Sequence, residues 1–197
     1  MANRYDPAVR ALYQMRQNRQ HLARNDAWIK RFLKEAAYCT VGTSWDSLPF
    51  LNPTVFWYDE ARHRIVFHSN ASGRVRANVE HNPRVCVSVQ EMGRFLPSNA
   101  PLEVSVQFRG VVMFGTAGVI EDPQEVRAAL QGLLAKYFPK LRLGAEFQPI
   151  SETDLRRTSV YEIQISEWSG KENWREQAEQ VDSWPPLSDE ILIGVFE

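Results

Sequence analysis

Cysteine is scarce in this sequence of 197 residues, and no long apolar run interrupts its mixture of polar and charged side chains. The two cysteines, Cys39 and Cys86, lie in apolar stretches, with no CxxC pair and no zinc-ligand spacing among the four histidines. We therefore expect two packed thiols rather than a disulfide, and no metal site. No stretch approaches the roughly 20 apolar residues that cross a bilayer, and the first residues lack the apolar segment of a secretory signal. These absences predict a cytoplasmic protein without a membrane partner.

Common catalytic signatures are also missing. The sequence contains no GxSxG, no P-loop and no GxGxxG, and its Ser, His and Asp residues show no triad pattern. The net charge of −1 argues against general nucleic-acid binding. What remains is an ordinary globular composition, 44% hydrophobic and 24% charged, at a length that suits one domain.

The two ends of the chain carry opposite charge. Residues 1–31 hold seven Lys and Arg against two Asp, and residues 172–197 hold seven Asp and Glu against one Arg. We expect a basic N-terminal helical arm over residues 1–25, a central domain over 26–171 and an acidic C-terminal arm over 172–197. The arms are either solvated or meet each other, within a chain or across an oligomer. Because the acidic arm holds many apolar residues, we expect it to dock on the protein near the basic helix.

Periodicity and turn residues predict the elements of the chain. Helices are expected at residues 7–20, 26–37 (with Asp26 as N-cap), 72–82 and 122–138. Strands are expected at residues 38–44, 50–58, 64–69, 83–91, 102–120 and 158–170, with loops at 95–101 and 139–157. Short connections favour antiparallel order, and Gly110, Gly115 and Gly118 indicate the bulges that a small barrel needs. The expected fold class is α+β, with six to seven antiparallel strands in a barrel and flanking helices.

The segment from Phe67 to Arg76, FHSNASGRVR, is the most informative for chemistry. A strand ends there, and a helix begins with two arginines in its first turn. Positive side chains are unfavourable there, because the helix N-terminus is the positive end of the helix dipole. A phosphate bound at this end would explain why arginines are present. The alternative is an ordinary N-terminal turn with exposed arginines. His68 is the first candidate for a general acid or base, although a histidine at a strand end can also serve the backbone.

Aromatic residues flank several predicted strand ends. Trp57, Tyr58 and Trp168 are the clearest, and they would suit a core edge, an oligomer contact or stacking on a planar ring system. The barrel alone would leave these three aromatic side chains partly exposed, which is unusual for a monomer. We therefore expect them at an interface between two copies of the chain.

Six segments, in this order, resemble the pyridoxamine 5′-phosphate oxidase-like, FMN-binding split-barrel family. The branch with nitroimidazole-resistance and predicted flavin-nucleotide-binding proteins is the most similar. The segments are FLKEAAYCTVGT, PFLNPTVFWYD, RIVFHSNASGR, HNPRVCVSV, FRGVVMFGTAGVIEDPQE and EIQISEWSGKEN. The resemblance implies a split barrel that forms a homodimer, with FMN, or FAD as the alternative, at the subunit interface.

The resemblance also implies a set of cofactor-binding residues. Strand residues would lie along the isoalloxazine ring, the strand end and helix start would hold the ribityl chain and phosphate, and the last two strands would add further contacts. In that order, these residues are Asn52, Pro53, Thr54 and Val55; His68, Ser69, Ser72, Gly73, Arg74 and Arg76; Gln107 and Arg109; and Trp168 and Lys171. His68 is in addition the candidate catalytic residue.

The sequence departs from the family pattern in three places, which limits the family properties that we expect of this protein. Val75 stands where many relatives have a second basic residue, and Phe108 and Gly110 stand where relatives of this branch have hydroxyl side chains. The chain ends in an acidic segment, whereas true pyridoxamine phosphate oxidases end in a basic one, so oxidation of vitamin B6 is not expected. We expect an FMN-dependent oxidoreductase that acts on a small molecule with NAD(P)H as donor. The alternatives are a flavin-binding module without turnover and a haem-handling barrel, with His63, His81 or His21 as axial ligand.

Overall fold

A computed structural model describes residues 20–194 of the chain, so most of the helix expected at 7–20 lies outside the described residues. The strands are β1 (Ala23–Arg24), β2 (Cys39–Trp45), β3 (Leu48–Thr54), β4 (Trp57–Asp59), β5 (Arg64–Asn70), β6 (Arg84–Leu96), β7 (Ser105–Val119) and β8 (Thr158–Asn173). The helices are α1 (Asp26–Glu35), α2 (Arg74–His81), α3 (Pro123–Tyr137), α4 (Glu152–Arg157) and α5 (Asp189–Gly194), with a 3₁₀ turn at Gln20–Leu22.

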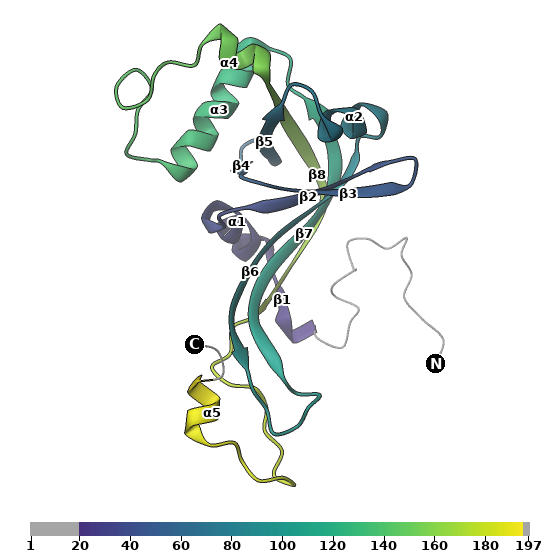
Figure 1. The fold of residues 1–197 in the computed structure, drawn as a ribbon, viewed down its shortest axis with the longest axis vertical. Helices are drawn as coiled ribbons and strands as arrows, with labels where there is room; N and C mark the ends of the chain where they lie inside the picture. Colours follow the sequence, from purple (N-terminus) through teal and green to yellow (C-terminus); the bar gives the residue numbers. More distant parts are fainter. Residues whose placement is uncertain (1–19, 195–197) are drawn as a thin grey trace.

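The strands form one antiparallel sheet in the order β3-β2-β6-β7-β8-β5-β4, and the short β1 pairs with β8. The upper body in Figure 1 holds the barrel, α3 and α4 above it, α2 beside the β2–β3 hairpin and α1 below. From this body the long strands β6, β7 and β8 curve downward as a stem. We call the lower end of the stem, residues 93–106 and 174–194, the tip. The expected α+β fold with an antiparallel split barrel is confirmed.

Two local features explain the shape of the sheet. Asp46 and Ser47 have positive φ angles of 44° and 68°, which suits a two-residue turn, so β2 and β3 run closer to their turn than the sequence predicted. On β7 the pairing with β8 shifts between Phe114 and Gly115. A Cβ at Gly115 would lie 2.2 Å from the Gln164 carbonyl oxygen, so only glycine fits this bulge. Gly110 and Gly118, also expected at bulges, lie in regular register instead.

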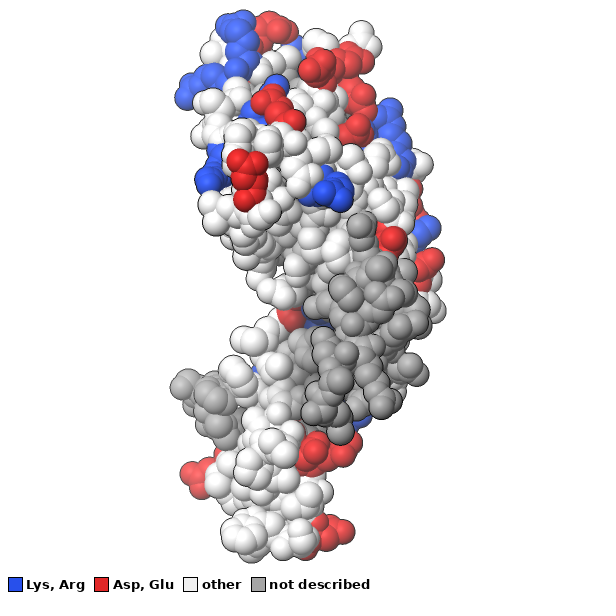
Figure 2. Space-filling view, turned by 90° about the vertical axis from the view of Figure 1, so that its right-hand side faces the viewer, with Lys and Arg blue, Asp and Glu red and all other residues white. Residues whose placement is uncertain are grey.

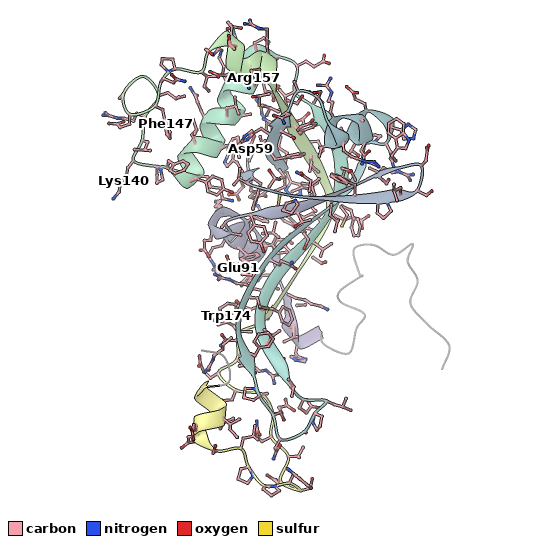
Figure 3. The ribbon with its side chains drawn as sticks, in the orientation of Figure 1. Asp59, Glu91, Lys140, Phe147, Arg157 and Trp174 are labelled. Carbon is pink, nitrogen blue, oxygen red and sulfur yellow. The ribbon has the colours of Figure 1, made fainter. Side chains whose placement is uncertain are left out.

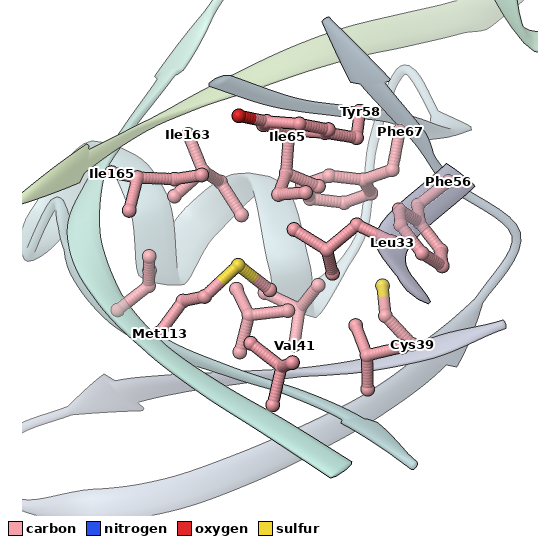
Figure 4. Packing of buried hydrophobic residues seen from close by; sticks show 14 of the residues in the cluster. Leu33, Cys39, Val41, Phe56, Tyr58, Ile65, Phe67, Met113, Ile163 and Ile165 are labelled. Atoms are coloured by element: carbon pink, nitrogen blue, oxygen red, sulfur yellow. The ribbon is translucent and has the colours of Figure 1, made fainter. Parts of the chain in front are cut away.

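The main core lies inside the barrel and is closed by α1 (Figure 4). The inner face of α1 contributes Ile29, Phe32 and Leu33, all buried. This helix begins at residue 26, as expected, but its N-cap is Asn25 and not Asp26, because the Asn25 side chain accepts the capping bond from the Trp28 N–H. A smaller cluster joins α3 to β5 and β8.

The aromatic residues expected at a dimer interface lie against the chain's own helices. Tyr58 is only 3% exposed, and Trp57 packs so closely on α3 that a Cβ at Gly132 would lie 2.4 Å from its ring. Trp168 is half-buried and donates its indole N–H to Asp26. The prediction that these rings would be partly exposed in one chain therefore holds for Trp57 and Trp168, which are half-buried, and is wrong for Tyr58, which belongs to the main core. The predicted strand at 50–58 is also split, into β3 and β4.

The acidic arm docks on the protein, as expected, but its seat among the described residues is the loop between β6 and β7. Asn99 is the centre of this contact: its side chain and N–H bond Gln180, Val181, Trp184 and Pro185. Gln107 adds a bond of 2.8 Å to the Arg175 carbonyl. The strand β8 runs on to Asn173 before the arm begins.

Cys39 and Cys86 are both free, as predicted. Among residues 20–194, no helix has the length and apolar character that a membrane span requires.

Candidate functional site

The start of α2 is an open anion-binding geometry. Gly73 has a φ of 148°, a conformation that favours glycine, and a Cβ there would meet no neighbouring atom within 4 Å. No side chain caps the helix, and its first turn contains no acidic residue. The free N–H groups and the positive end of the dipole therefore face an open space.

The polar side chains around this helix start make few contacts within the chain. Among the described residues, Ser69, Ser72 and Arg74 have no hydrogen-bond or ion-pair partner for their side chains, and Arg74 only packs over the ring of Phe50 at 5.8 Å. The two hydroxyls and the guanidinium can therefore donate hydrogen bonds to a ligand. An arginine fork with hydroxyls and helix N–H groups is a donor set that suits a phosphate monoester.

The contact of Arg74 with Phe50 brings β3 to the helix start. Beyond Phe50, the strand continues through Asn52, Pro53 and Thr54, which pair with β2 at the sheet edge, and Val55 follows it. Asn52 and Thr54 are half-buried, whereas Pro53 and Val55 are exposed. The contact of Arg74 with Phe50 thus places one part of β3 against the start of α2.

The second arginine of α2 is used differently. Arg76 bonds Glu80 on its own helix and the Ser159 hydroxyl on β8, the latter at 3.0 Å. Beside them lies Tyr161, fully buried, whose hydroxyl has no hydrogen-bond partner among the described residues. Burial raises the pKa of Tyr161, while the nearby Ser159 hydroxyl and Arg76 oppose that rise.

His68 lies one residue before Ser69, so their side chains leave β5 on opposite faces. His68 pairs with Val160, a member of the cluster beneath α3, and Ser69 pairs with Ser159. His68 is exposed, but partial desolvation lowers its pKa below the ordinary value of 6.5, so the neutral imidazole predominates at pH 7. A neutral imidazole can accept a proton or donate a hydrogen bond, which keeps the residue a candidate base.

Gln107 and Arg109 lie on the stem rather than at α2. Gln107 is buried and bonds Arg175 and the Arg94 N–H. Arg109 pairs with Glu91 at 2.6 Å and lies over the rings of Phe32 and Trp174, each at 5.2 Å (Figure 3). Both side chains are engaged in joining the stem to α1 and the arm.

Trp168 and Lys171 lie further along β8. Trp168 contacts α1 and the ring of His63, and Lys171 lines a hollow of about 480 Å³ over the face of β6, β7 and β8. Ser159, which pairs with Ser69, and Lys171 are twelve residues apart on one strand, or up to about 40 Å at 3.3 Å per residue. One chain therefore does not bring these residues to the start of α2.

A backbone contact that the sequence did not predict joins the end of α4 to the segment before α2. Residues 152–157 form α4, whose last residues are Arg156 and Arg157. The Arg157 carbonyl accepts the Ala71 N–H at 3.0 Å, next to Ser72 and Gly73 (Figure 3). The pairing of Asn70 with Thr158 creates this contact, and no local sequence signal encodes it.

The donors at the start of α2 are thus suited to an anion. Within residues 20–194, no cluster of three or more His, Cys, Asp or Glu side chains could hold a metal ion.

Comparison with known proteins gives the family. The family model described as pyridoxamine 5′-phosphate oxidase matches residues 25–172. None of the curated proteins matches.

Three solved structures are similar over most of the chain. The FAD and heme binding protein from Mycobacterium smegmatis has 19% identity and a TM-score of 0.72, with 88% of this chain and 91% of that chain covered. The flavocytochrome Anf3 from Azotobacter vinelandii has 27% identity and a TM-score of 0.66, with 87% and 75% covered. A protein assigned to 5-nitroimidazole antibiotic resistance from Bacteroides thetaiotaomicron has 20% identity and a TM-score of 0.64, with 76% and 85% covered.

The family match spans the barrel, α2 and the phosphate-type donor set at its start, and the solved structures repeat the split-barrel fold. The chain therefore belongs to the pyridoxamine 5′-phosphate oxidase family of split-barrel proteins.

Proposed function

We propose that this protein binds a flavin nucleotide and acts as a flavin-dependent oxidoreductase on a small molecule, with NAD(P)H as electron donor. The observation that carries the proposal is the set of unengaged donors at the start of α2, beside the β3 edge, in a chain of this family. The FMN unit, as FMN itself or as half of FAD, has the matching parts: a planar ring and a phosphate ester.

Different residues of the chain would bind the phosphate and the ring of the flavin. Ser69, Ser72, Gly73 and Arg74 would hold the phosphate nearest the ribityl chain, since they supply hydroxyls, N–H groups and a charged fork. The β3 residues 52–55 would lie along the ring. The flavin supplies the redox chemistry when bound, and His68, neutral at pH 7, is the residue that would take up or release a proton.

The proposal includes a homodimer with the flavin at its interface. The outward face of β2, β3, β6 and β7 supports it: Leu51 and Met92 are 67% and 66% exposed there, beside hollows of about 480 and 590 Å³. An apolar face of this size favours association. The partner would then supply the contacts from Trp168 and Lys171 that one chain does not bring to α2. Two free cysteines suit a reducing compartment, so we place the protein in the cytoplasm.

Haem is the second candidate, because two of the similar structures are named for a haem or a cytochrome. The three histidines considered as axial ligands are each held by other groups. His63 contacts the Tyr58 hydroxyl, His81 pairs with Asp46 and stacks on Trp45, and His21 contacts Arg175. We therefore put flavin before haem for this chain.

The visible spectrum of the purified protein tests the proposal. We expect flavin bands in the blue, and slow oxidation of NAD(P)H that speeds up when an electron acceptor is added. A Soret band without flavin bands would favour the haem candidate. A flavin spectrum without any NAD(P)H oxidation would leave a binding module and contradict the enzymatic part.

A further inference from the structure

We propose that the side-chain amine of Lys136 is a modification site, which takes an acyl group from an activated donor such as an acyl phosphate or an acyl thioester. Lys136 lies near the C-terminal end of α3, where this helix meets the end of α1 and the segment before β4. The inference does not depend on the proposed function, because it concerns a nucleophilic group that flavin binding does not use.

The amine of Lys136 is held over apolar groups. Its Nζ atom lies 3.4 Å from the centre of the Phe56 ring and 3.2 Å from the Leu33 carbonyl oxygen. Phe56 and Leu33 are fully buried, and they lie beside Cys39 at one end of the main core (Figure 4). Lys136 itself is half-buried, so part of its side chain remains open to a small donor molecule.

These two contacts suit a neutral amine better than an ammonium group. A neutral amine has two N–H groups, and here the Leu33 carbonyl oxygen and the face of the Phe56 ring can accept one each. The lone pair on Nζ is then free to attack an electrophile. The third N–H of an ammonium group has no further acceptor within residues 20–194, where Lys136 makes no other hydrogen bond and no ion pair.

Three other lysines of the chain have different surroundings. Lys30 and Lys34 both pair with the Glu60 carboxylate, which stabilises their protonated form. Lys140, four residues beyond Lys136, is exposed, so water solvates its ammonium group. Lys136 alone of these four combines partial burial with the lack of a carboxylate partner in the described part of the chain.

Burial is also the main cause of a lowered pKa of Lys136, about 8 in place of 10.5. A Cys39 thiolate would oppose this shift, but burial raises the pKa of Cys39 to about 12 and that of the neighbouring Tyr137 above its ordinary value of 10.0. Both groups are therefore uncharged at pH 7.5. About a quarter of the Lys136 amines are unprotonated at that pH, against about one in a thousand for an ordinary lysine.

The acylation step needs no further reactant. The Nζ lone pair attacks the carbonyl carbon of the donor and forms a C–N bond. The bond from that carbon to the phosphate oxygen or the thiolate sulfur breaks, the leaving group keeps the electron pair, and the nitrogen loses one proton to water. The product is a neutral amide whose remaining N–H can still donate to the Leu33 carbonyl oxygen, so the half-buried charge is removed while α3 stays bonded to α1.

Competitive acetylation tests the inference, with acetyl phosphate and acetyl-coenzyme A as separate donors and each lysine followed by mass spectrometry of its peptide. At pH 7.5 we expect Lys136 to react about tenfold faster than Lys140, the matched control, since its larger unprotonated fraction outweighs the lower reactivity of a less basic nucleophile, as known for thiols. The rate at Lys136 should reach half of its maximum near pH 8. In concentrated urea the difference between the two lysines should vanish.

Thermal stability gives a second readout. Protein acetylated at Lys136, like Lys136→Gln, should lack the rise in stability between pH 8 and 10 that a lysine with a lowered pKa produces, whereas Lys140→Gln should keep it. Preference for Lys136 with only one of the donors would support the site and identify the class of donor. Acetylation of Lys136 no faster than that of Lys140 with both donors would overturn the inference.

Discussion

The barrel and the tip of the stem are held together in different ways. The barrel encloses a continuous apolar core in which Leu33, Val41 and Phe67 are fully buried. The tip exposes Leu102 at 92% and Trp184 at 66%, and polar bonds from Asn99 fasten the arm there. Acidic side chains lie on the tip in the view of Figure 2, while both signs of charge mix over the upper body. We therefore expect apolar burial in the barrel to dominate the global stability, and the tip to open without unfolding of the barrel.

Disruption of a buried ion network in the barrel should give the largest loss of unfolding free energy. Arg64 is 3% exposed and bonds Asp59, Glu125 and Glu162, which ties α3 to the barrel. Arg64→Ala leaves the buried Asp59 carboxylate without its charge partner, so we expect a loss of about 3–5 kcal/mol in unfolding free energy by urea titration. A loss under 1 kcal/mol would contradict a structural role for the network.

The same network predicts an acid response. Bonds from Arg64 hold the pKa of Glu125 below its ordinary value of 4.5, so this stabilisation is complete above that pH and is lost as pH falls through the lowered value. The wild type should therefore lose more stability between pH 5 and 3 than Arg64→Ala does. If the stability of the two proteins fell equally with pH, the assignment of this acid response to the Arg64–Glu125 pair would be contradicted.

The core and tip leucines give the most direct contrast. Leu33→Ala empties a fully buried site and should cost about 2–5 kcal/mol in unfolding free energy. Leu102→Ala, the same change at an exposed site, should stay within about 0.5 kcal/mol. Equal losses would mean that the tip is covered and shares the core, for example in a dimer.

The Asn99 contact tests whether the tip is a separate unit. Asn99→Ala removes the side-chain bonds to the arm, so amide hydrogen exchange at residues 174–194 should accelerate, while the melting temperature of the barrel changes by little. Asn82→Ala, which removes two side-chain bonds near the β2–β3 hairpin, to the Ser44 hydroxyl and from the Arg84 N–H, is the control and should leave exchange in the arm unchanged. A cooperative loss of the whole fold in Asn99→Ala would show that arm and barrel form one unit.

A smaller effect is expected from Lys136, which lies over the Phe56 ring and donates to the Leu33 carbonyl. Burial lowers its pKa from 10.5 to about 8, so between these values the unfolded chain binds more protons and stability should rise with pH. Lys136→Met should flatten this rise in thermal melts between pH 8 and 10. An unchanged slope would contradict the burial of the ammonium group.

The sequence predicted the barrel well because its signals are local. The short apolar run within 64–69 and the Pro-led helix at 122–138 each fit one element, and the structure has both. The burial of Tyr58 was missed, because it depends on how distant elements pack in the core and not on the residues beside Tyr58. The donor groups at the start of α2 were predicted from the residues of segment 67–76 itself. The backbone contact of this segment with Arg157 was not predicted, since only the pairing of β5 with β8 brings α4 there.

The dissociation constants of FMN and riboflavin for wild type and Arg74→Gln test the central claim most directly. Arg74 is the one unengaged arginine among the described residues of α2, and a charge-assisted bond to phosphate contributes about 1.5–3 kcal/mol. We predict that Arg74→Gln weakens FMN by about tenfold or more and leaves riboflavin within twofold, while Arg31→Gln, a change of an exposed arginine on α1, alters neither. Equal weakening of both ligands, or no weakening of FMN, would contradict a flavin phosphate at the start of α2.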